Sequence, residues 1–453
     1  MRELMKNGMD VARFNFSHSD HSVHKARFET VCKLREELGV NIATLLDTKG
    51  PEVRLKNFKD HKPVTIKDGD TFTLTTREVE GDETICSITF PQLPKDVSVG
   101  TRILINDGNI ELKALRVDNT DIVCEVIHGG VVSDHKGINV PDVNLSMPYI
   151  SDADMADLEF GAKMGFDYIA ASFVRTGADV IYLRKFTQSL GWFNPRIIAK
   201  IENAQGVANI DEILDAADGI MVARGDMGVE IPFEQIPAIQ KELIRKAYNA
   251  GKNVITATQM LESMITNARP TRAEITDVAN AIYDGSSAIM LSGETAAGKY
   301  PVEAVKTMSL IAETTEKDID YISRFKKRVD ERNSSITDAI SHATVTTAHD
   351  LNAVAILTVT KGGTTARTLS KFRPNCPIIA LTTDDTTYHQ LSLSWGIRAG
   401  VIEEKTNTDE LIRHALERSV ELGYLKKGDL VVITAGVPLG MSGTTNLLKV
   451  ERA

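Results

Sequence analysis

The chain has 453 residues, a length at which two or three domains are more usual than one hydrophobic core. Hydrophobic residues make up 42% and charged residues 25%, which is typical of a globular protein and excludes a disordered chain. The 52 basic and 62 acidic residues give a net charge of −10 at pH 7, which argues against a general affinity for nucleic acid or membranes.

Two further features restrict the class of protein. The four cysteines, Cys32, Cys86, Cys124 and Cys376, lie far apart without a CxxC pairing, so neither a zinc site nor a disulfide framework is indicated. No apolar run is long enough to span a membrane, and the N-terminus lacks the apolar core of a signal peptide. We therefore expect a cytoplasmic protein.

Short apolar runs alternate with helical patterns along much of the chain. The runs are 11–16, 41–46, 166–173, 196–201, 219–222, 253–256 and 286–291. Helical patterns such as 237–249 and 272–283 lie between them. Runs that are buried on both faces and separated by helices are typical of parallel strands, and so many units favour closure of the sheet. The pattern therefore predicts an α/β fold with a (β/α)8 barrel of the TIM type.

Two other regions depart from this alternation. Between residues 54 and 141, alternating apolar patches and turn dipeptides such as Asp68-Gly69 predict an inserted all-β domain. After residue 335 the strand and helix pattern resumes, which predicts a separate C-terminal α/β domain. The expected organisation is a barrel (1–53), an inserted all-β domain (54–141), the rest of the barrel (142–330) and a C-terminal α/β domain (331–453).

Charged residues gather at the ends of two predicted strands. Because side chains alternate along a strand, Lys200 and Glu202 point to the same side at the end of the run 196–201. Asp226 follows the next run, and the carboxyl ends of barrel strands carry the active site. Two carboxylates there suit magnesium or manganese, although an isolated charged pair at a strand end is more often a solvated surface. Arg224 is either a ligand group or a structural partner of a carboxylate.

The first two predicted strands also end in polar residues. Arg13, Asn15 and Ser17 share one side of the first strand. The second strand ends in the segment 47–52, and Arg54 follows shortly after. Their oxygen atoms suit a hard cation and the guanidinium suits a phosphate, while capping and turn formation is the alternative for the polar residues. Hydroxyls and carboxylates follow two further strands, at Thr258, Glu262, Ser292 and Glu294.

Taken together, six segments resemble pyruvate kinase. They are ARFNFSH at 12–18, LLDTKGPEVR at 45–54, IIAKIEN at 197–203, MVARGDMGVE at 221–230, TATQMLESM at 256–264 and IMLSGETAAG at 289–298. The resemblance spans the barrel, the inserted β domain and the C-terminal domain. It implies transfer of the phosphoryl group of phosphoenolpyruvate to ADP, which gives pyruvate and ATP in the last step of glycolysis.

The resemblance implies a role for each residue of the barrel site. Glu202 and Asp226 are expected to hold the catalytic Mg²⁺ or Mn²⁺, and Lys200 to neutralise the moving phosphoryl group. Charge stabilisation of this kind is what phosphoryl transfer mainly requires. Arg13 is expected to clamp the phosphate, with Arg54. The substrate-binding set is completed by Gly225 and Asp226, whose amides open a short helix, and by Thr258, near the face where the enolate is protonated.

Potassium and nucleotide sites follow from the same resemblance. The implied K⁺ ligands are Asn15, Ser17, Asp47 and Thr48. Glu52 occupies the position whose acidic form accompanies potassium dependence, so we expect activation by potassium. The implied nucleotide contacts are Asn15, Phe16, Ser17, His18, Arg54 and Lys136. Lys136 reaches in from the inserted domain, which would act as a closing lid, although on its own it reads as an exposed loop lysine.

An effector site is implied in the C-terminal domain. The expected phosphate loop is Thr360, Lys361, Gly362, Gly363, Thr364 and Thr365, and the loop that closes over it contains Ser442, Gly443 and Thr444. The expected effector is a sugar phosphate or a nucleotide, and a simple turn is the alternative. The resemblance also implies a homotetramer that is regulated allosterically.

The chain departs from the family at its start. It begins at the helical segment 2–6, so we expect the first barrel strand to be missing, which leaves two unpaired edges. The sequence is then either shortened or that of an inactive protein. Ser19 also replaces the glycine that usually follows the histidine.

Two rival functions remain open. One is a barrel lyase that uses a magnesium bound by Glu and Asp to stabilise an enolate. Such an enzyme needs neither Lys200 beside the metal nor a lid that carries Lys136. The other is a non-catalytic protein that still binds the effector.

Overall fold

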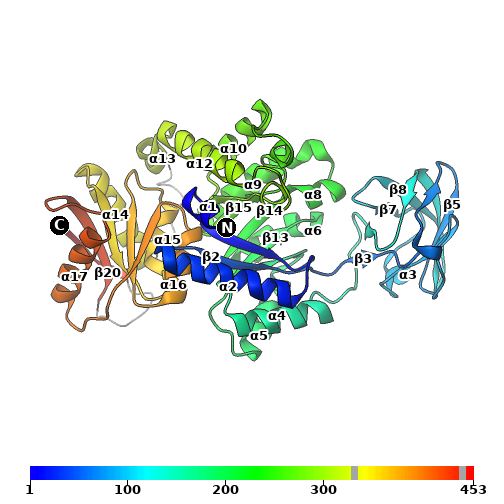
Figure 1. The fold of residues 1–453 in the computed structure, drawn as a ribbon, viewed down its shortest axis with the longest axis horizontal. Helices are drawn as coiled ribbons and strands as arrows, with labels where there is room; N and C mark the ends of the chain where they lie inside the picture. The colour runs from blue at the N-terminus through cyan, green and yellow to red at the C-terminus, as the bar shows by residue number, and fades with distance from the viewer. Residues whose placement is uncertain (328–334, 438–444) are drawn as a thin grey trace.

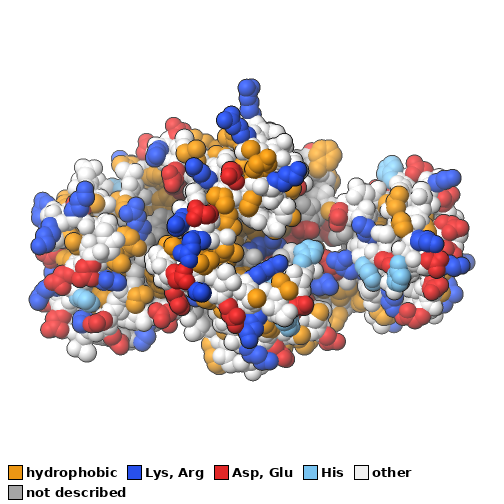
Figure 2. Space-filling view, viewed as in Figure 1, with side chains coloured by type: hydrophobic (Ala, Val, Ile, Leu, Met, Phe, Trp, Pro, Cys, Tyr) orange, Lys and Arg blue, Asp and Glu red, His pale blue; other side chains and the backbone are white. Residues whose placement is uncertain are grey.

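The computed structural model describes residues 1–327, 335–437 and 445–453. Three bodies lie in a row in Figure 1: a parallel sheet wrapped by helices in the centre, a second sheet on one side and the C-terminal α/β unit on the other. Figure 2 shows acidic and basic side chains interspersed over the visible face. None of the helices in the described ranges is long and apolar enough to cross a bilayer. The four cysteines are free thiols.

The central sheet has seven strands. In spatial order they are β1 (Val11–Asn15), β2 (Ala43–Asp47), β12 (Tyr168–Ala171), β13 (Arg196–Ile201), β14 (Gly219–Ala223), β15 (Asn253–Ala257) and β16 (Ala288–Ile289). All neighbouring pairs are parallel. Among the described residues the two end strands, β1 and β16, do not pair with each other. The sheet is thus the curled parallel sheet of the predicted TIM-type fold, and in the described residues it is open between β16 and β1.

Helices surround this sheet. They are α1 (Arg2–Lys6), α2 (His21–Leu38), α4 (Asp152–Met164), α5 (Gly177–Ser189), α6 (Ala204–Ala208), α7 (Ile210–Ala216), α8 (Arg224–Glu230), α9 (Ile236–Ala250), α10 (Arg272–Asp284), α11 (Gly293–Ala296), α12 (Pro301–Asp318) and α13 (Tyr321–Lys327). Ser151, Thr176 and Thr271 begin α4, α5 and α10 with capping boxes, which satisfy amides that the first turn leaves free.

The strands are buried on both faces, which explains their continuous apolar runs. Ile197, Ile220 and Val254 pack outwards in one cluster with helix side chains. Ile198, Met221 and Ile255, each one residue further along, belong to a second cluster on the other face. This alternation leaves only the strand ends for polar residues, and so it places the candidate site there.

The second sheet contains the residues predicted as the inserted all-β domain. Its strands, in spatial order, are β3 (Val53–Arg54), β11 (Gly137–Asn139), β7 (Arg102–Ile105), β8 (Ile110–Val117), β9 (Asp121–His128), β5 (Thr71–Thr75) and β6 (Ile85–Ser87). A separate pair is formed by β4 (Val64–Ile66) and β10 (Gly130–Val132), and α3 spans Leu93–Asp96. All pairs of the sheet except β5 with β6 are antiparallel. Figure 1 shows this body joined to the barrel near β3.

The C-terminal unit is a five-stranded sheet. Its order is β19 (Ile397–Val401), β18 (Ile378–Thr382), β17 (Ala355–Val359), β20 (Leu430–Gly436) and β21 (Thr445–Arg452), of which only β21 is antiparallel. The helices are α14 (Ile336–Asp350), α15 (Thr364–Lys371), α16 (Asp385–Gln390) and α17 (Thr408–Glu421). The predicted α/β class of this region is therefore correct.

Helix α16 packs against the amino ends of the barrel strands. Gln390 at its end donates to the carbonyls of Asp167 at 3.1 Å and Asn194 at 2.7 Å, and its own carbonyl accepts from the Tyr168 hydroxyl. Asn41 donates to the carbonyl of Tyr388 at 2.8 Å. The C-terminal unit thus holds the end of the barrel opposite to the candidate site.

Candidate active site

The carboxyl ends of the central strands meet at one edge of the sheet because neighbouring strands are parallel and in register. Asn15 pairs with Asp47, and Asp47 pairs with Ala170 of β12. Ala171 then pairs with Ala199, the residue before Lys200. The predicted convergence of these strand ends is therefore present.

Lys200 lies at the centre of the convergent side chains. Its Nζ is 2.7 Å from Ser172 Oγ, 2.9 Å from Glu202 Oε1 and 3.1 Å from Asp47 Oδ1. Asp47 is fully buried, Glu202 is 1% exposed and Lys200 is 9% exposed. Arg13 Nε donates to the other oxygen of Asp47. An ammonium with three acceptors in a nearly dry site is held in one orientation.

The electrostatics of the cluster are shaped by burial and by charge balance. Burial alone would lower the pKa of Lys200, but the Asp47 and Glu202 carboxylates raise it above its usual value, so the ammonium stays charged. Burial would raise the pKa of Asp47, but Lys200 and Arg13 hold it below its usual value. Glu202 differs, because its pKa is raised to about 7. Burial and the nearby Asp226 carboxylate raise this pKa, and Lys200 offsets only part of the rise.

The raised pKa of Glu202 bears on the predicted magnesium site. Glu202 and Asp226 repel each other electrostatically, and a divalent cation between them would relieve this repulsion. Magnesium is usually held by one or two carboxylates together with water and substrate oxygens, so two protein ligands fit it. In the described part of the chain, no group of three or more His, Cys, Asp or Glu forms a site of its own. The donor set therefore fits a metal shared with a substrate.

The residues at the carboxyl ends of β1 and β2 make hydrogen bonds and ring contacts within the protein. Asn15 Oδ1 accepts from the Ser17 amide at 3.1 Å, which is the turn role that the sequence left open. Phe16 is buried and stacks on His24 with ring centroids 4.1 Å apart. A nucleotide contact from Phe16 would therefore come from its backbone. The Ser172 amide donates to the Thr48 hydroxyl at 3.0 Å, and Thr48 follows Asp47 in the chain.

Helix α8 carries Gly225 and Asp226 as its second and third residues. The Gly225 amide donates to Thr258 Oγ1 at 2.9 Å, and that hydroxyl donates to the Ala257 carbonyl at 2.6 Å. Thr258 adopts φ 67°, which is rare for a β-branched residue. The hydrogen and one lone pair of the Thr258 hydroxyl are thus used within the protein. Of the two amides predicted to bind a carboxylate, only that of Asp226 is left for it.

Arg224 takes the structural role of the two that the sequence allowed. Its guanidinium pairs with Asp277 at 2.7 Å and donates to the carbonyls of Ala257 at 3.1 Å and Thr258 at 2.5 Å. It ties the start of α8 to the end of β15. Glu294 is likewise engaged, because it accepts from the amides of Leu261 at 3.1 Å and Ser292 at 2.8 Å.

The predicted nucleotide residues of the second sheet lie at its β3 edge. Arg54 bonds to Glu52 through Nε at 2.7 Å and to the His135 carbonyl at 2.7 Å. The Leu55 amide donates to the carbonyl of Lys136, so this edge carries Lys136 too. Asn139 contacts Glu230 of α8 at 3.5 Å. No contact in the described ranges joins the Lys136 side chain to the Lys200 cluster.

The predicted effector loop connects β17 with α15. Gly363 has φ 76° at the cap of α15, and Thr365 shares a 2.7 Å hydrogen bond with Thr445 of β21. The Gly362 carbonyl accepts from Arg196 of the barrel at 3.2 Å and from Arg367. Burial and the neighbouring Arg196 lower the pKa of Arg367 to about 10. Ser442, Gly443 and Thr444, predicted to close over this loop, lie outside the described residues.

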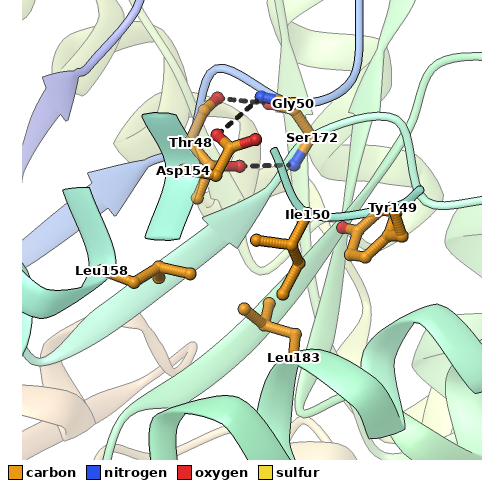
Figure 3. Close-up of a pocket in the computed structure, with 8 residues that line it drawn as sticks. All are labelled: Thr48, Gly50, Tyr149, Ile150, Asp154, Leu158, Ser172 and Leu183. Atoms are coloured by element: carbon orange, nitrogen blue, oxygen red, sulfur yellow. Dashed lines mark hydrogen bonds between the residues drawn. The ribbon is translucent and has the colours of Figure 1, made fainter. Parts of the chain in front are cut away.

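Two residues that contact the cluster were missed by sequence reasoning: Ser172 and Phe173, which follow β12. Ser172 bonds to Lys200, and the Phe173 amide donates to Glu202 Oε2 at 2.6 Å. Figure 3 shows Ser172 joined to Thr48 by hydrogen bonds, beside a small pocket lined on its far side by Ile150, Leu158 and Leu183. The rule that selected the other candidates, a polar residue directly after a barrel strand, passed over Ser172 because the predicted run 166–173 contained it, whereas β12 ends at Ala171.

Comparisons with known proteins extend over the whole chain. One family model, described as pyruvate kinase, barrel domain, matches residues 1–305, and another, described as pyruvate kinase, alpha/beta domain, matches residues 338–451. The pyruvate kinase of Clostridium acetobutylicum is 48% identical over 449 residues, which cover 99% of this chain and 95% of that protein. That of Geobacillus stearothermophilus is 49% identical over 451 residues, which cover 99% of this chain and 77% of that protein. A solved pyruvate kinase from Cryptosporidium parvum has a TM-score of 0.93 and 39% identity, covering 100% of this chain and 92% of that one.

Proposed function

Since the chain belongs to the pyruvate kinase family, whose members transfer a phosphoryl group from phosphoenolpyruvate to ADP, we propose that its reaction takes place at Lys200, Glu202 and Asp226. The products are pyruvate and ATP. The observation that carries this assignment is the buried Lys200 ammonium, bonded to two carboxylates at the carboxyl ends of parallel strands. A lyase that only stabilises an enolate has no need of this ammonium.

Lys200 and Arg13 supply the positive charge that the transferring group requires. Lys200 stays protonated because Asp47 and Glu202 raise its pKa, so it neutralises charge on the phosphoryl oxygens as they move. Arg13 is held by Asp47 on β2 and presents its remaining N–H groups to the phosphate. These groups are fixed before substrate arrives, so little reorganisation is needed during transfer.

Glu202 and Asp226 would hold the divalent cation that the family generally requires, Mg²⁺ or Mn²⁺. Such a cation, when bound, acts as a Lewis acid on phosphate and enolate oxygens. The Asp226 amide, in the first turn of α8, is proposed to bind the substrate carboxylate. Thr258 orders Gly225 beneath that substrate, and its engaged hydroxyl makes it an orienting group rather than a proton donor.

Potassium is the second cation that the family generally requires, and we assign it to Asn15, Ser17, Asp47 and Thr48. The register of β1 and β2 supports this assignment, since it pairs Asn15 with Asp47. Each Asp47 oxygen has two acceptor positions, so a monovalent ion can share it with Arg13 or Lys200.

The nucleotide is proposed to bind at Asn15, Phe16, Ser17 and His18 together with Arg54 and Lys136. Arg54 and Lys136 belong to the second sheet, so binding of ADP requires that sheet to approach the barrel as a lid. The Glu52 carboxylate beside Arg54 keeps this guanidinium oriented until phosphate replaces it.

Regulation is proposed to act through the loop from Thr360 to Thr365, with a sugar phosphate or a nucleotide as effector. The bond from Arg196 to the Gly362 carbonyl supports a link between this loop and the barrel, because Arg196 is the first residue of the strand that carries Lys200. A homotetramer and a cytoplasmic location stay predictions from the sequence.

One assay tests the function directly: pyruvate formation from phosphoenolpyruvate and ADP, with Mg²⁺ and either K⁺ or Na⁺. Turnover that requires Mg²⁺ and rises with K⁺ is the expected result. A folded full-length protein that forms no pyruvate under any of these conditions would instead favour the non-catalytic alternative, a chain that binds only the effector.

A further inference from the structure

The end of strand β12 supplies two contacts to the active-site cluster that no predicted role accounts for. Ser172 Oγ lies 2.7 Å from Lys200 Nζ, and the amide of the next residue, Phe173, lies 2.6 Å from Glu202 Oε2. Ser172 is 1% exposed. One dipeptide therefore touches both the proposed phosphoryl-stabilising lysine and a proposed metal ligand.

The Ser172 hydroxyl is oriented by strand β2. It donates its single hydrogen to the Thr48 carbonyl at 2.7 Å, with Asp47 Oδ1 further away at 3.3 Å. The Ser172 amide donates to the Thr48 hydroxyl at 3.0 Å, so two hydrogen bonds fasten this residue to Thr48 (Figure 3). Because the hydroxyl hydrogen is used, its lone pairs are left for the Lys200 ammonium.

All three hydrogens of the Lys200 ammonium are engaged, and Ser172 is its nearest partner. The other two partners, Glu202 at 2.9 Å and Asp47 at 3.1 Å, are buried carboxylates. A phosphoryl oxygen that bonds to Lys200 must displace one of the three. Loss of a neutral hydroxyl is the least unfavourable exchange, because displacement of a carboxylate would leave a buried charge unpaired.

We propose that Ser172 is a positioning residue for phosphoryl transfer: its hydroxyl holds one N–H of Lys200 in place until a phosphoryl oxygen replaces the hydroxyl as the acceptor of that hydrogen bond. This inference rests on the proposed role of Lys200 in that transfer. The hydroxyl forms no covalent bond and transfers no proton. It fixes the direction of the ammonium before the substrate enters, which removes a reorganisation step from the reaction.

Phe173 and Gly50 hold Ser172 in this place. Phe173 has φ 53°, a left-handed conformation that is rare for a bulky residue and that directs its amide to Glu202. A Cβ on Gly50 would lie 2.8 Å from Ser172 Cβ and 2.9 Å from the Phe173 ring, so the loop after β2 reaches the dipeptide only because residue 50 is glycine.

Ser172→Ala tests the proposal, because it removes the hydroxyl and leaves the lysine and both carboxylates. We expect kcat for pyruvate formation to fall about 10- to 100-fold, the range for misplacement of a catalytic group by up to about 1 Å, with KM for phosphoenolpyruvate nearly unchanged. Metal-dependent exchange of pyruvate methyl protons with solvent, followed by NMR, should stay within about threefold of wild type, since it does not use the ammonium.

Two further variants separate positioning from structure. Ser172→Thr keeps the hydroxyl beside the small pocket that Ser172 lines, so a folded variant should recover most of kcat. Ser286→Ala is the matched control, because it removes another buried serine hydroxyl, bonded to Thr256 at 2.7 Å on strand β15. It should lower the unfolding midpoint by a similar amount and leave kcat within about twofold.

Three outcomes would overturn the proposal. They are a Ser172→Ala enzyme with kcat within about twofold of wild type, equal losses of phosphoryl transfer and proton exchange, or a folded Ser172→Thr enzyme no faster than Ser172→Ala. If Lys200→Met instead leaves phosphoryl transfer intact, the role of Lys200 itself is wrong, so the two failures are distinguishable.

Discussion

Replacement of Lys200 by methionine is the most direct test of the active-site assignment. The substitution keeps the apolar stem but removes the ammonium that contacts Ser172, Glu202 and Asp47 at 2.7 to 3.1 Å. Loss of one neutral donor to a developing negative charge lowers kcat by about 10²- to 10³-fold. Since the lost donor here carries a full charge in a nearly dry site, we expect phosphoryl transfer to fall by more than about 10³-fold.

Folding stability provides a second measure of the same substitution. Removal of one partner from a buried ion pair destabilises a protein by about 3–5 kcal/mol, because a charge is left unpaired. We expect about 3 kcal/mol, the lower limit, because Arg13 still neutralises Asp47. Lys246→Met is the control: Lys246 pairs with the exposed Asp211 at 2.8 Å, and its loss should cost at most about 1 kcal/mol in denaturant unfolding.

Two assays on the same enzyme preparation decide the roles. Pyruvate formation with Mg²⁺ and K⁺ reports phosphoryl transfer, and NMR of the pyruvate methyl group reports proton exchange. We expect Lys200→Met to abolish the first and to spare the second, because the carboxylates proposed to hold the metal remain. Equal loss of both activities would refute the assignment of Lys200 to the phosphoryl step.

Three further predictions concern the cation, the effector and pH. Glu52→Lys places a fixed positive charge beside Arg54, so turnover should become equal in K⁺ and Na⁺. Unchanged potassium dependence would show the cation assignment to be wrong. Arg196→Gln removes the bond to the Gly362 carbonyl, so activation by a sugar phosphate should weaken about 5- to 10-fold. The basal kcat should stay near wild type. Unchanged activation would argue against this contact as the link between the two sites. Burial, with Arg35 nearby, lowers the pKa of His389 from 6.5 to about 4. As the pH falls, the unfolded chain therefore takes up this proton before the folded protein does. The free energy of unfolding should decrease as the pH falls from 6.5 towards 4. With partial exposure taken into account the loss is about 1–2 kcal/mol, and His389→Gln should make denaturant unfolding less dependent on pH between 7 and 4.5.

The parts of the site that could be predicted are those that depend on strand periodicity. Lys200 and Glu202 are two residues apart, so a strand of any kind places them on one side, and Asp226 follows the next strand. Burial of Phe14 and Phe16 on the other side of β1 follows from the same rule. Strand periodicity does not predict which residue forms an ion pair with each charged side chain. Arg224 illustrates this, because its partner Asp277 lies 53 residues away and only helix packing brings them together.

Backbone conformation accounts for the residues that were missed. The predicted strand 166–173 included both Ser172 and Phe173, and nothing in the sequence indicates that Phe173 adopts φ 53° and turns its amide towards Glu202. Thr258 is similar: the sequence does not indicate φ 67° or the bonds from its hydroxyl to the Gly225 amide and the Ala257 carbonyl. Left-handed conformations of non-glycine residues are imposed by the surrounding fold, so they are invisible to local patterns.

Strand β13 connects the two ends of the barrel in a way that favours mechanical coupling. Arg196 at its start bonds to the proposed effector loop, and Lys200 lies four residues further on, about 13 Å away at the rise of a strand. Because β13 is paired with both β12 and β14, it is the kind of rigid element that carries coupling, and we expect a shift at Arg196 to reach Lys200. The three bonds of the ammonium are 2.7 to 3.1 Å long, and hydrogen bonds weaken beyond about 3.2 Å, so a displacement of about 0.5 Å is enough to loosen them. An effector that pulls on the Gly362 carbonyl therefore acts on the same ammonium that Ser172 positions. For this reason, Ser172→Ala should diminish the response to effector as well as kcat, and a full response in that variant would place the coupling elsewhere.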